Sequence, residues 1–202
     1  MSDITNPQWG TFALVSYIPD PLGSFLHGLR QSLPGEDTPQ PHVTILPPRP
    51  LKLPVDAASQ QVKDILSRFS AFAVELSSIR SFGETKILYL DIGEGNRVLY
   101  DLHSALNAGD LAHDELFTFR PHLTLAGPIP EPDMKRFRRK AETAWHSVTC
   151  PVRFVMEEIV FLWMPSNGRP GEWVRLWSHY LKAAEKSAAR ATAAAAITTQ
   201  TY

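Results

Sequence analysis

Two short segments of the chain carry residues whose types and spacing could do chemistry. Each reads Pro-His-x-Thr, once in the first half of the sequence and once in the second. Residues two apart on a strand point to the same face. Each segment would therefore present one imidazole and one hydroxyl on one side and an aliphatic side chain on the other. If the two segments meet, the groove between them holds His42, Thr44, His122 and Thr124.

Two imidazoles and two hydroxyls suit phosphoryl chemistry at a ribose. The ordinary pKa of histidine, about 6.5, lets one ring take a proton from the attacking oxygen while the other protonates the leaving oxygen. Threonine hydroxyls can donate hydrogen bonds to phosphate oxygens. The sequence therefore predicts His42 and His122 as an acid–base pair and Thr44 and Thr124 as phosphate-binding residues, with no metal and no cofactor.

The alternative is that both histidines are structural. A single His-x-Thr pattern is a weak signal, because many strands contain it by chance. Two copies are much harder to reach by accident when each is preceded by a proline, each is followed by an aliphatic residue and each lies on a predicted strand. We therefore favour the catalytic interpretation.

Apolar spacing predicts the elements that must position these segments. Each half contains a strand, a helix and a Pro-His-x-Thr strand, which indicates a mixed α and β fold with two related halves. Helices are expected at residues 22–33, 56–69, 97–106 and 132–146, and strands at residues 12–18, 41–46, 72–79, 86–92 and 117–125, followed by a hairpin of residues 152–164 and 173–181.

Composition and charge argue against several classes of protein, namely binders of long nucleic-acid duplexes, disulfide-bonded proteins and membrane proteins. The chain has 202 residues, 44% of them hydrophobic, and its net charge of −1 lacks the basic excess typical of proteins that grip long duplexes. The single cysteine, Cys150, excludes an intrachain disulfide. No signal-peptide pattern opens the sequence, and no apolar run approaches the roughly 18 residues of a membrane helix. We expect a monomeric, cytoplasmic protein that acts on small or short substrates.

Other residue clusters have ordinary interpretations. His103, His113 and Glu115, with two aspartates nearby, match no compact metal-ligand spacing and are typical of a polar helix end and loop. The basic run at residues 135–140 is expected to be the solvated face of a helix, with RNA contact as the alternative. Three tryptophans on the closing hairpin are expected in the core or on the sheet, although one could stack a base.

The paired motifs resemble the two-histidine phosphoesterases, specifically the 2′-5′ RNA ligase-like and cyclic phosphodiesterase group. The resemblance runs from about Thr11 to Leu181. It is carried by HVTI at residues 42–45 and FRPHLTLA at residues 119–126. It implies an α+β, bilobal, duplicated fold, with two antiparallel sheets flanked by helices and an active site in the groove between the lobes.

We expect one domain followed by a short tail. Residues 1–181 should form a single bilobal domain, and residues 182–202 an Ala- and Thr-rich tail that is partly helical or disordered. We expect His42 and His122 on adjacent central strands of the two lobes, facing each other across a groove wide enough for one phosphate.

The resemblance also implies an activity on RNA ends or small nucleotides. This activity is hydrolysis of 2′,3′-cyclic phosphates or reversible joining of 2′-5′ linkages, with His122 as the base toward water and His42 as the acid toward the ribose oxygen. Two other functions stay open. One is a phosphodiesterase for small cyclic nucleotides or 2′,5′-oligoadenylates, and the other is a nucleotide-binding module without turnover.

One departure from the family pattern concerns positive charge. Many relatives carry an arginine shortly after the second motif, where this chain has Ala126-Gly127-Pro128. Arg49, beyond the first motif, or Arg120, two residues before His122, could bind substrate instead. The alternative for both is a solvated surface arginine.

Overall fold

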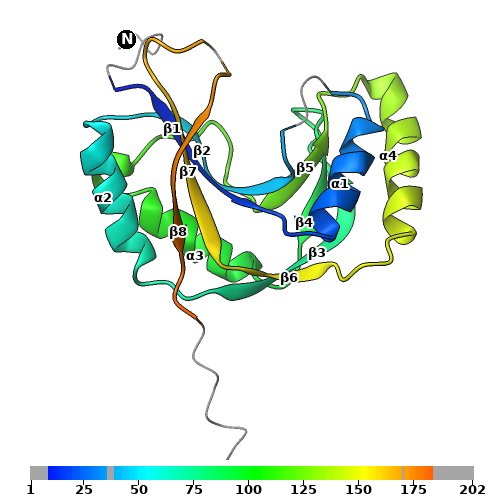
Figure 1. Cartoon of the computed structure of the whole chain (residues 1–202). Helices are drawn as coiled ribbons and strands as arrows, with labels where there is room; N and C mark the ends of the chain where they lie inside the picture. The colour runs from blue at the N-terminus through cyan, green and yellow to red at the C-terminus, as the bar shows by residue number, and fades with distance from the viewer. Residues whose placement is uncertain (1–8, 36–38, 170, 184–202) are drawn as a thin grey trace, which may run out of the picture.

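The strands form two four-stranded antiparallel sheets in the computed structural model, which describes residues 9–35, 39–169 and 171–183 (Figure 1). The first sheet has the order β2-β1-β7-β8, and the second has the order β5-β4-β3-β6. The strands of the first sheet are β1 (Thr11–Tyr17), β2 (His42–Pro50), β7 (Glu158–Met164) and β8 (Val174–Tyr180). Those of the second are β3 (Phe72–Ser81), β4 (Leu88–Ile92), β5 (His122–Ala126) and β6 (Arg153–Met156).

The two halves of the chain exchange helices between the sheets. Helix α1 (Leu22–Gln31) follows β1 but contacts β5 of the second sheet, and it packs beside α4 (Glu131–His146) (Figure 1). Helix α3 (Asn96–Leu106) follows β4 but contacts β2 of the first sheet and packs beside α2 (Val55–Leu66). Each lobe therefore contains chain from both halves. This arrangement confirms the predicted α+β, bilobal, duplicated fold.

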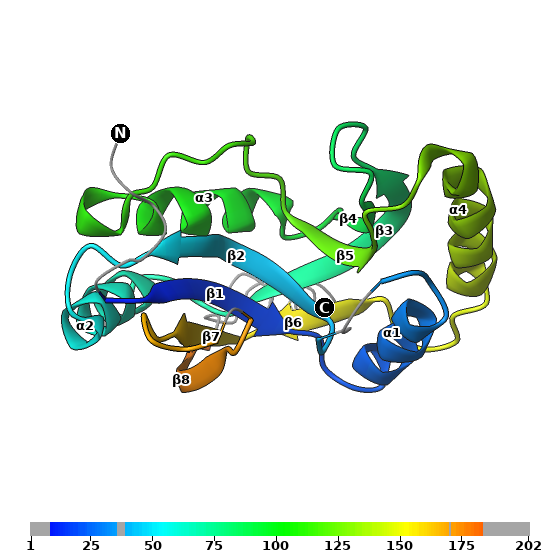
Figure 2. The ribbon, with the colours of Figure 1, turned by 90° about the horizontal axis from the view of Figure 1, so that it is seen from above.

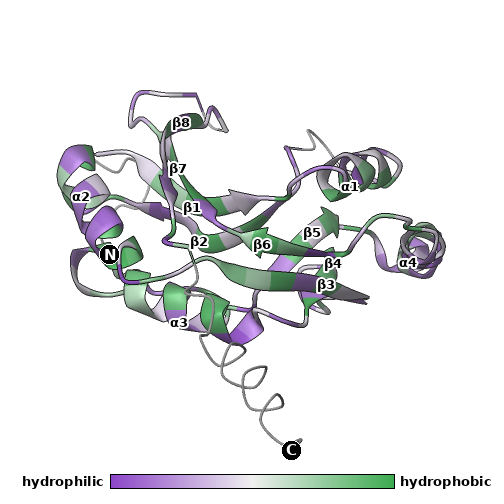
Figure 3. Cartoon of the chain, turned by 60° about the horizontal axis from the view of Figure 1, so that its bottom comes forward, coloured by the Kyte–Doolittle hydropathy of each residue, from purple (hydrophilic) through white to green (hydrophobic). Residues whose placement is uncertain are grey.

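Alternation along the motif strands builds the core beneath the site. Val43, Ile45 and Leu123 are fully buried, whereas the histidine and threonine of each motif are partly exposed. The aliphatic residues join one core cluster that runs through both lobes. Helix α4, which buries only Ala141, is hydrophilic over much of its surface (Figure 3).

Strands β2 and β5 are the edge strands of their sheets, so the expectation of central strands was wrong. They nevertheless contact each other in the middle of the molecule, where the two sheet edges meet (Figure 2). Each sheet thus covers the edge of the other, which protects two rows of backbone groups that would otherwise be open to another chain.

Two predicted strands have different bounds in the structure, because the strands with which they pair lie far away in the sequence. Residues 152–164 were expected as one strand, but the chain breaks at Glu157, so that β6 pairs with β3 and β7 pairs with β1. The Glu157 carbonyl instead accepts a hydrogen bond from the Leu181 amide at 2.7 Å. Residues 117–125 were also expected as one strand, but only His122–Ala126 pair with β4.

The described chain continues slightly beyond the predicted domain boundary. The Lys182 carbonyl accepts a hydrogen bond from the Ala71 amide at 2.7 Å. The predicted tail from residue 184 onward lies outside the described residues. Within the part of the chain that the structure describes, no helix is long and apolar enough to cross a membrane.

A buried ion pair fixes the end of β2 against the loop that leads to β5. The Arg49 side chain is only 1% exposed and pairs with Glu115. Its Nε donates to the Pro47 carbonyl at 3.1 Å, and Nη1 donates to Asn107 Oδ1 at 2.5 Å. Because Glu115 lies in the loop that leads to β5, its pair with Arg49 ties the two lobes together beside the motif strands.

We expect Arg49→Met to lower the free energy of unfolding by about 3 kcal/mol, because it leaves the Glu115 carboxylate without its guanidinium partner. This is the low end of the range for a broken buried pair, since Glu115 is 15% exposed and keeps His103 nearby. Urea denaturation measures the change, with Arg97→Met on the exposed surface of α3 as the control. Equal stability of the two variants would contradict this account of the pair.

Candidate active site

The four motif side chains come from the two edge strands that meet. His42 pairs across the sheet with Tyr17 on β1, and His122 pairs with Asp91 on β4. The motif threonines follow two residues later on the same faces, and all four residues are partly exposed. The structure therefore brings each imidazole and hydroxyl out of the core, as the alternation predicts.

The two imidazoles are held in the same way. His42 Nδ1 lies 2.8 Å from the Gln40 carbonyl, and His122 Nδ1 lies 2.7 Å from the Arg120 carbonyl. A carbonyl oxygen can only accept a hydrogen bond, so each Nδ1 carries the proton and donates it. Each Nε2 is then the ring nitrogen left to exchange a proton with a substrate. The repeat thus extends from the sequence motif to the tautomer of its histidine.

Burial makes both rings weaker bases than exposed histidine. Burial lowers the pKa of His42, its bond to the Gln40 carbonyl raises it, and the positive charges of Arg30 and His122 lower it further. The positive charge of His122 is among the causes that lower the His42 pKa, so protonation of His122 disfavours protonation of His42.

The surroundings of His122 are more balanced in charge. Burial lowers its pKa most, the bond to the Arg120 carbonyl raises it, the Arg120 guanidinium lowers it, and the Asp91 carboxylate raises it. Both histidines are therefore held toward the neutral form, but only His122 has a carboxylate that favours the proton. An incoming phosphate would supply negative charge to both and favour protonation of one ring.

Aromatic rings fix the walls around His122. Phe82 and Tyr89 are stacked with centroids 4.1 Å apart, and both meet the His122 ring edge-on, at 5.0 Å and 5.4 Å. The corresponding contact of His42 is with Tyr17, whose ring centroid lies 6.1 Å away. These rings limit the orientations of the imidazoles and exclude water from one side of each.

A cavity of about 890 Å³ takes Thr44 from the first motif and His122 from the second. Its other walls include three phenylalanines, Phe82, Phe117 and Phe119, so much of its surface is apolar. A second cavity of about 690 Å³ lies against Tyr17 and is lined in part by Asp20, Glu158, Arg175 and Tyr180. His42 and Thr124 line neither cavity wall.

The two arginines proposed from the sequence lie in different surroundings. The Arg120 guanidinium donates to both carboxylate oxygens of Asp91, at 3.2 Å and 3.0 Å, and it is 41% exposed. Arg80, which the sequence did not single out, shares the same carboxylate at 3.0 Å. Two guanidiniums on one carboxylate leave a net positive charge beside His122. Arg49 borders the larger cavity, but its guanidinium already donates to three protein acceptors.

The loop cluster around Glu115 is built into the fold. His103 Nδ1 lies 2.8 Å from the Ile45 carbonyl, its Nε2 lies 3.4 Å from Glu115, and its ring stacks on Phe119 at 3.7 Å. Among the described residues, no group of three or more His, Cys, Asp or Glu side chains is arranged to hold a metal ion. These contacts support the structural interpretation of His103.

We expect His42 and His122 to titrate below about 6.5, the ordinary histidine pKa, because burial disfavours the charged ring. NMR titration of the imidazole nitrogens measures this, and His122→Ala should raise the pKa of His42 by removing a nearby positive charge.

The same lowered pKa values predict how stability depends on pH. A lowered folded-state pKa means that the unfolded chain binds more protons, so the protein should lose stability as the pH falls below about 6.5. Either ring titrating above that value would contradict the burial argument.

Comparisons with known proteins agree with this geometry. The family model of the 2′-5′ RNA ligase superfamily matches residues 18–168. A candidate phosphoesterase of Geobacillus sp. (strain WCH70) is 32% identical over a 98-residue alignment, which covers 44% of this chain and 56% of that protein. The match therefore spans only about half the length of that relative.

Solved structures show the same fold at low sequence identity. Escherichia coli LigT complexed with 3′-AMP has a TM-score of 0.58 at 15% identity, over 86% of this chain and 98% of LigT. LigT complexed with phosphate has a TM-score of 0.55 at 16% identity, and a protein of Thermus thermophilus has 0.58 at 15%, with the same coverage of both chains. With the family model matching most of its length, the chain belongs to the 2′-5′ RNA ligase superfamily.

Proposed function

We propose that this protein is a metal-independent phosphoesterase that hydrolyses 2′,3′-cyclic phosphate ends of RNA or nucleotides, or reversibly joins 2′-5′ RNA linkages. The observation that carries the proposal is the matched pair of imidazoles on meeting strands, each of which donates its Nδ1 proton to a backbone carbonyl two residues earlier in the chain. Two rings that both offer Nε2 can serve as a base and an acid in one reaction.

In hydrolysis, a water oxygen attacks the phosphorus while one imidazole takes its proton. The bond from phosphorus to one ribose oxygen breaks, and the other imidazole protonates that oxygen, which leaves a phosphomonoester and a free hydroxyl. The Thr44 and Thr124 hydroxyls donate to the non-bridging oxygens and stabilise their charge. The assignment of His122 as base and His42 as acid stays a prediction.

The cavities support a nucleotide-sized substrate. The phenylalanines of the larger cavity offer apolar faces on which a base could stack, and the paired Arg80 and Arg120 place net positive charge beside His122. The smaller cavity leaves room for a second group across the phosphate, such as the other nucleoside of a 2′-5′ linkage. The LigT structures that hold 3′-AMP and phosphate support a nucleotide ligand for this fold.

Two alternatives are separated by one experiment. A phosphodiesterase for small cyclic nucleotides or 2′,5′-oligoadenylates would use the same groove, whereas a nucleotide-binding module would need no matched acid and base. A panel of 2′,3′-cyclic mononucleotides, cyclic-phosphate-ended RNA, and 2′,5′-linked oligomers, with products identified by phosphorus NMR, tests all three. Binding of the panel without any turnover would establish the binding module.

We expect His42→Ala or His122→Ala alone to remove most of kcat/KM, and the double variant to be only slightly worse, because the two groups act in one transition state. The wild-type kcat/KM should be bell-shaped in pH, since one ring must be neutral and the other charged. His146→Ala, an exposed histidine at the end of α4, is the control. A single variant with near wild-type rate would contradict the mechanism.

Removing one phosphate-binding hydroxyl should cost less than removing a histidine. We expect Thr44→Ala and Thr124→Ala to raise the activation free energy by about 1–3 kcal/mol each, the scale of a hydrogen bond to a charged group. Thr→Ser at either position should retain most of the rate, because the hydroxyl remains. Steady-state kinetics at constant pH compares the Ala and Ser variants at each position. Equal losses of rate for Ser and Ala would mean that the threonine contributes through the packing of its methyl group and not through its hydroxyl.

Turnover should not depend on a divalent metal. We expect activity to survive exhaustive chelation and dialysis, because the donors that neutralise the phosphate are the histidines, threonines and arginines of the chain. Initial rates before and after chelation, with zinc or manganese added back, measure this. Activity lost on chelation and restored by one of these metals would overturn the acid–base account.

A further inference from the structure

Helices α1 and α3 occupy corresponding places in the two halves of the chain, and each carries one buried polar residue at the same position of a shared leucine pattern. Helix α1 and the residues after it read Leu-x-x-Leu-Arg-x-x-Leu from Leu26, and α3 reads Leu-x-x-Leu-His-x-x-Leu from Leu99. Arg30 and His103 therefore occupy matching positions, and both are only 7% exposed. The duplication allows a direct comparison of what each residue contacts.

His103 has partners for every polar atom. Its Nδ1 lies against the Ile45 carbonyl of β2, its Nε2 faces Glu115, and its ring stacks on Phe119. Phe119 stands three residues before His122, so His103 packs against the chain that leads into the second motif. This contact is complete without any ligand.

Arg30 makes the matching contact, but within the part of the chain that the structure describes its charge has no acidic partner. Its Nη1 donates to the Pro39 carbonyl at 2.5 Å, and Pro39 stands three residues before His42. Its Nε has no hydrogen-bond partner, and among the described residues no carboxylate lies within ion-pair distance of its guanidinium. A buried cation without an anion is costly, and proteins normally pair such a charge.

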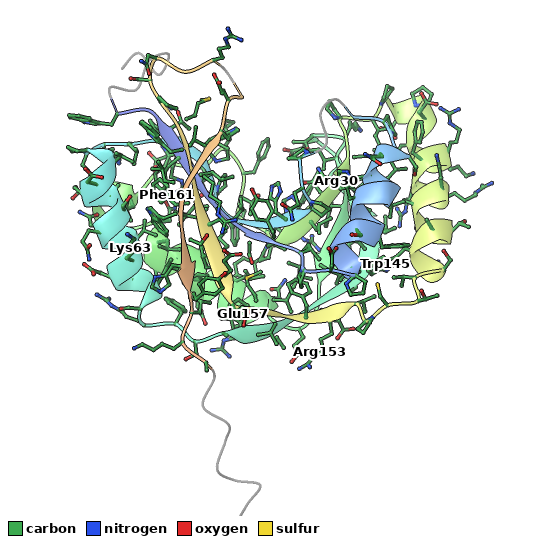
Figure 4. The ribbon with its side chains drawn as sticks, in the orientation of Figure 1. Arg30, Lys63, Trp145, Arg153, Glu157 and Phe161 are labelled. Atoms are coloured by element: carbon green, nitrogen blue, oxygen red, sulfur yellow. The ribbon has the colours of Figure 1, made fainter. Side chains whose placement is uncertain are left out.

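The position of Arg30 relates its charge to the active site. Pro39 adjoins Gln40, whose carbonyl holds His42 Nδ1. Helix α1, which carries Arg30, contacts β5, the strand of the second motif (Figure 4). The charge of Arg30 also lowers the pKa of His42, which places the guanidinium in the electrostatic surroundings of that ring. Of the other arginines near the motifs, Arg49 and Arg120 are already paired with carboxylates.

We propose that Arg30 is a substrate-binding residue of this site, and that its missing partner is a phosphate oxygen of the substrate at the His42 end of the groove. The proposal rests on the proposed function, because it takes the ligand to be a phosphate ester. A planar guanidinium held by one backbone carbonyl still has donors for a phosphate, and a charge-assisted bond to it is stronger than a neutral one.

Inorganic phosphate is the probe for this site, with binding followed through the His42 Nε2 resonance. Arg30→Met should weaken phosphate binding about tenfold or more, the effect of losing one charge-assisted bond, and Arg30→Lys should lie between Met and wild type. Arg97→Met, an exposed arginine on α3, should bind phosphate like wild type. A wild-type protein without measurable phosphate affinity, or an Arg30→Met variant with unchanged affinity, overturns the proposal.

Thermal stability separates a ligand-binding arginine from a structural one. Arg30→Met should have a Tm equal to or above that of wild type, because it removes an uncompensated buried charge, and phosphate should raise the Tm of wild type more than that of the variant. A large drop in Tm on Arg30→Met, with unchanged phosphate affinity, would assign Arg30 to the fold.

The rival hypothesis is that Arg30 pairs with Glu36 or Asp37, which lie outside the described residues. If they neutralise it, Glu36→Gln/Asp37→Asn should lower the Tm of wild type but not that of Arg30→Met, and this non-additive loss would overturn the proposal. Failure of the proposed function is distinguishable. A wild-type protein that binds phosphate through Arg30 but turns over none of the cyclic or 2′-5′ substrates would contradict only the proposed function.

Discussion

The contact between β2 and β5 is the interaction on which the site depends. Each strand has its sheet partner on one side only, so its other edge would be open in an isolated lobe. Bringing the two edges together protects both and aligns two motifs that are far apart in the sequence. The exchange of α1 and α3 between lobes, together with the Arg49–Glu115 pair, holds the edges in place. A groove between loosely tethered lobes could not keep two imidazoles in register with one phosphate.

Burial then sets the chemistry of the two rings. The backbone carbonyls of Gln40 and Arg120 fix the tautomers, and partial burial holds both rings toward the neutral form. Arg80 and Arg120 share the single carboxylate of Asp91 and so leave positive charge beside the His122 ring. In the proposed function, a phosphate anion would offset this positive charge and favour protonation of one ring. In the proposed reaction, the substrate itself creates the acid of the acid–base pair.

The duplicated halves are alike in backbone and unlike in charge. His42 has Tyr17 across the strand pair, whereas His122 has Asp91, which binds Arg80 and Arg120. The matching helix positions carry Arg30 in one half and His103 in the other. In the proposed reaction the phosphate carries different groups on its two sides, and a duplicated fold with different charges in its two halves suits such a substrate.

Local patterns predicted the parts of this protein that depend on local spacing. Alternation around His42 and His122 placed both side chains on the open faces, and apolar periodicity located all four described helices within a few residues. Pairing between distant segments could not be predicted in the same way. The break at Glu157 exists because β6 and β7 join different sheets, and the two glutamates at residues 157 and 158 do not by themselves indicate that change of partner. Arg30, Arg80 and Asp91 were missed because their relation to the motifs arises only from strand register and helix packing.

The most direct test of the account is a titration of the protein, labelled with ¹⁵N in its histidines, with inorganic phosphate. If one phosphate lies between the two motifs, the Nε2 resonances of His42 and His122 should shift together, with one dissociation constant and at a ratio of one phosphate per chain. Shifts of only one histidine, or two different dissociation constants, would contradict the shared site.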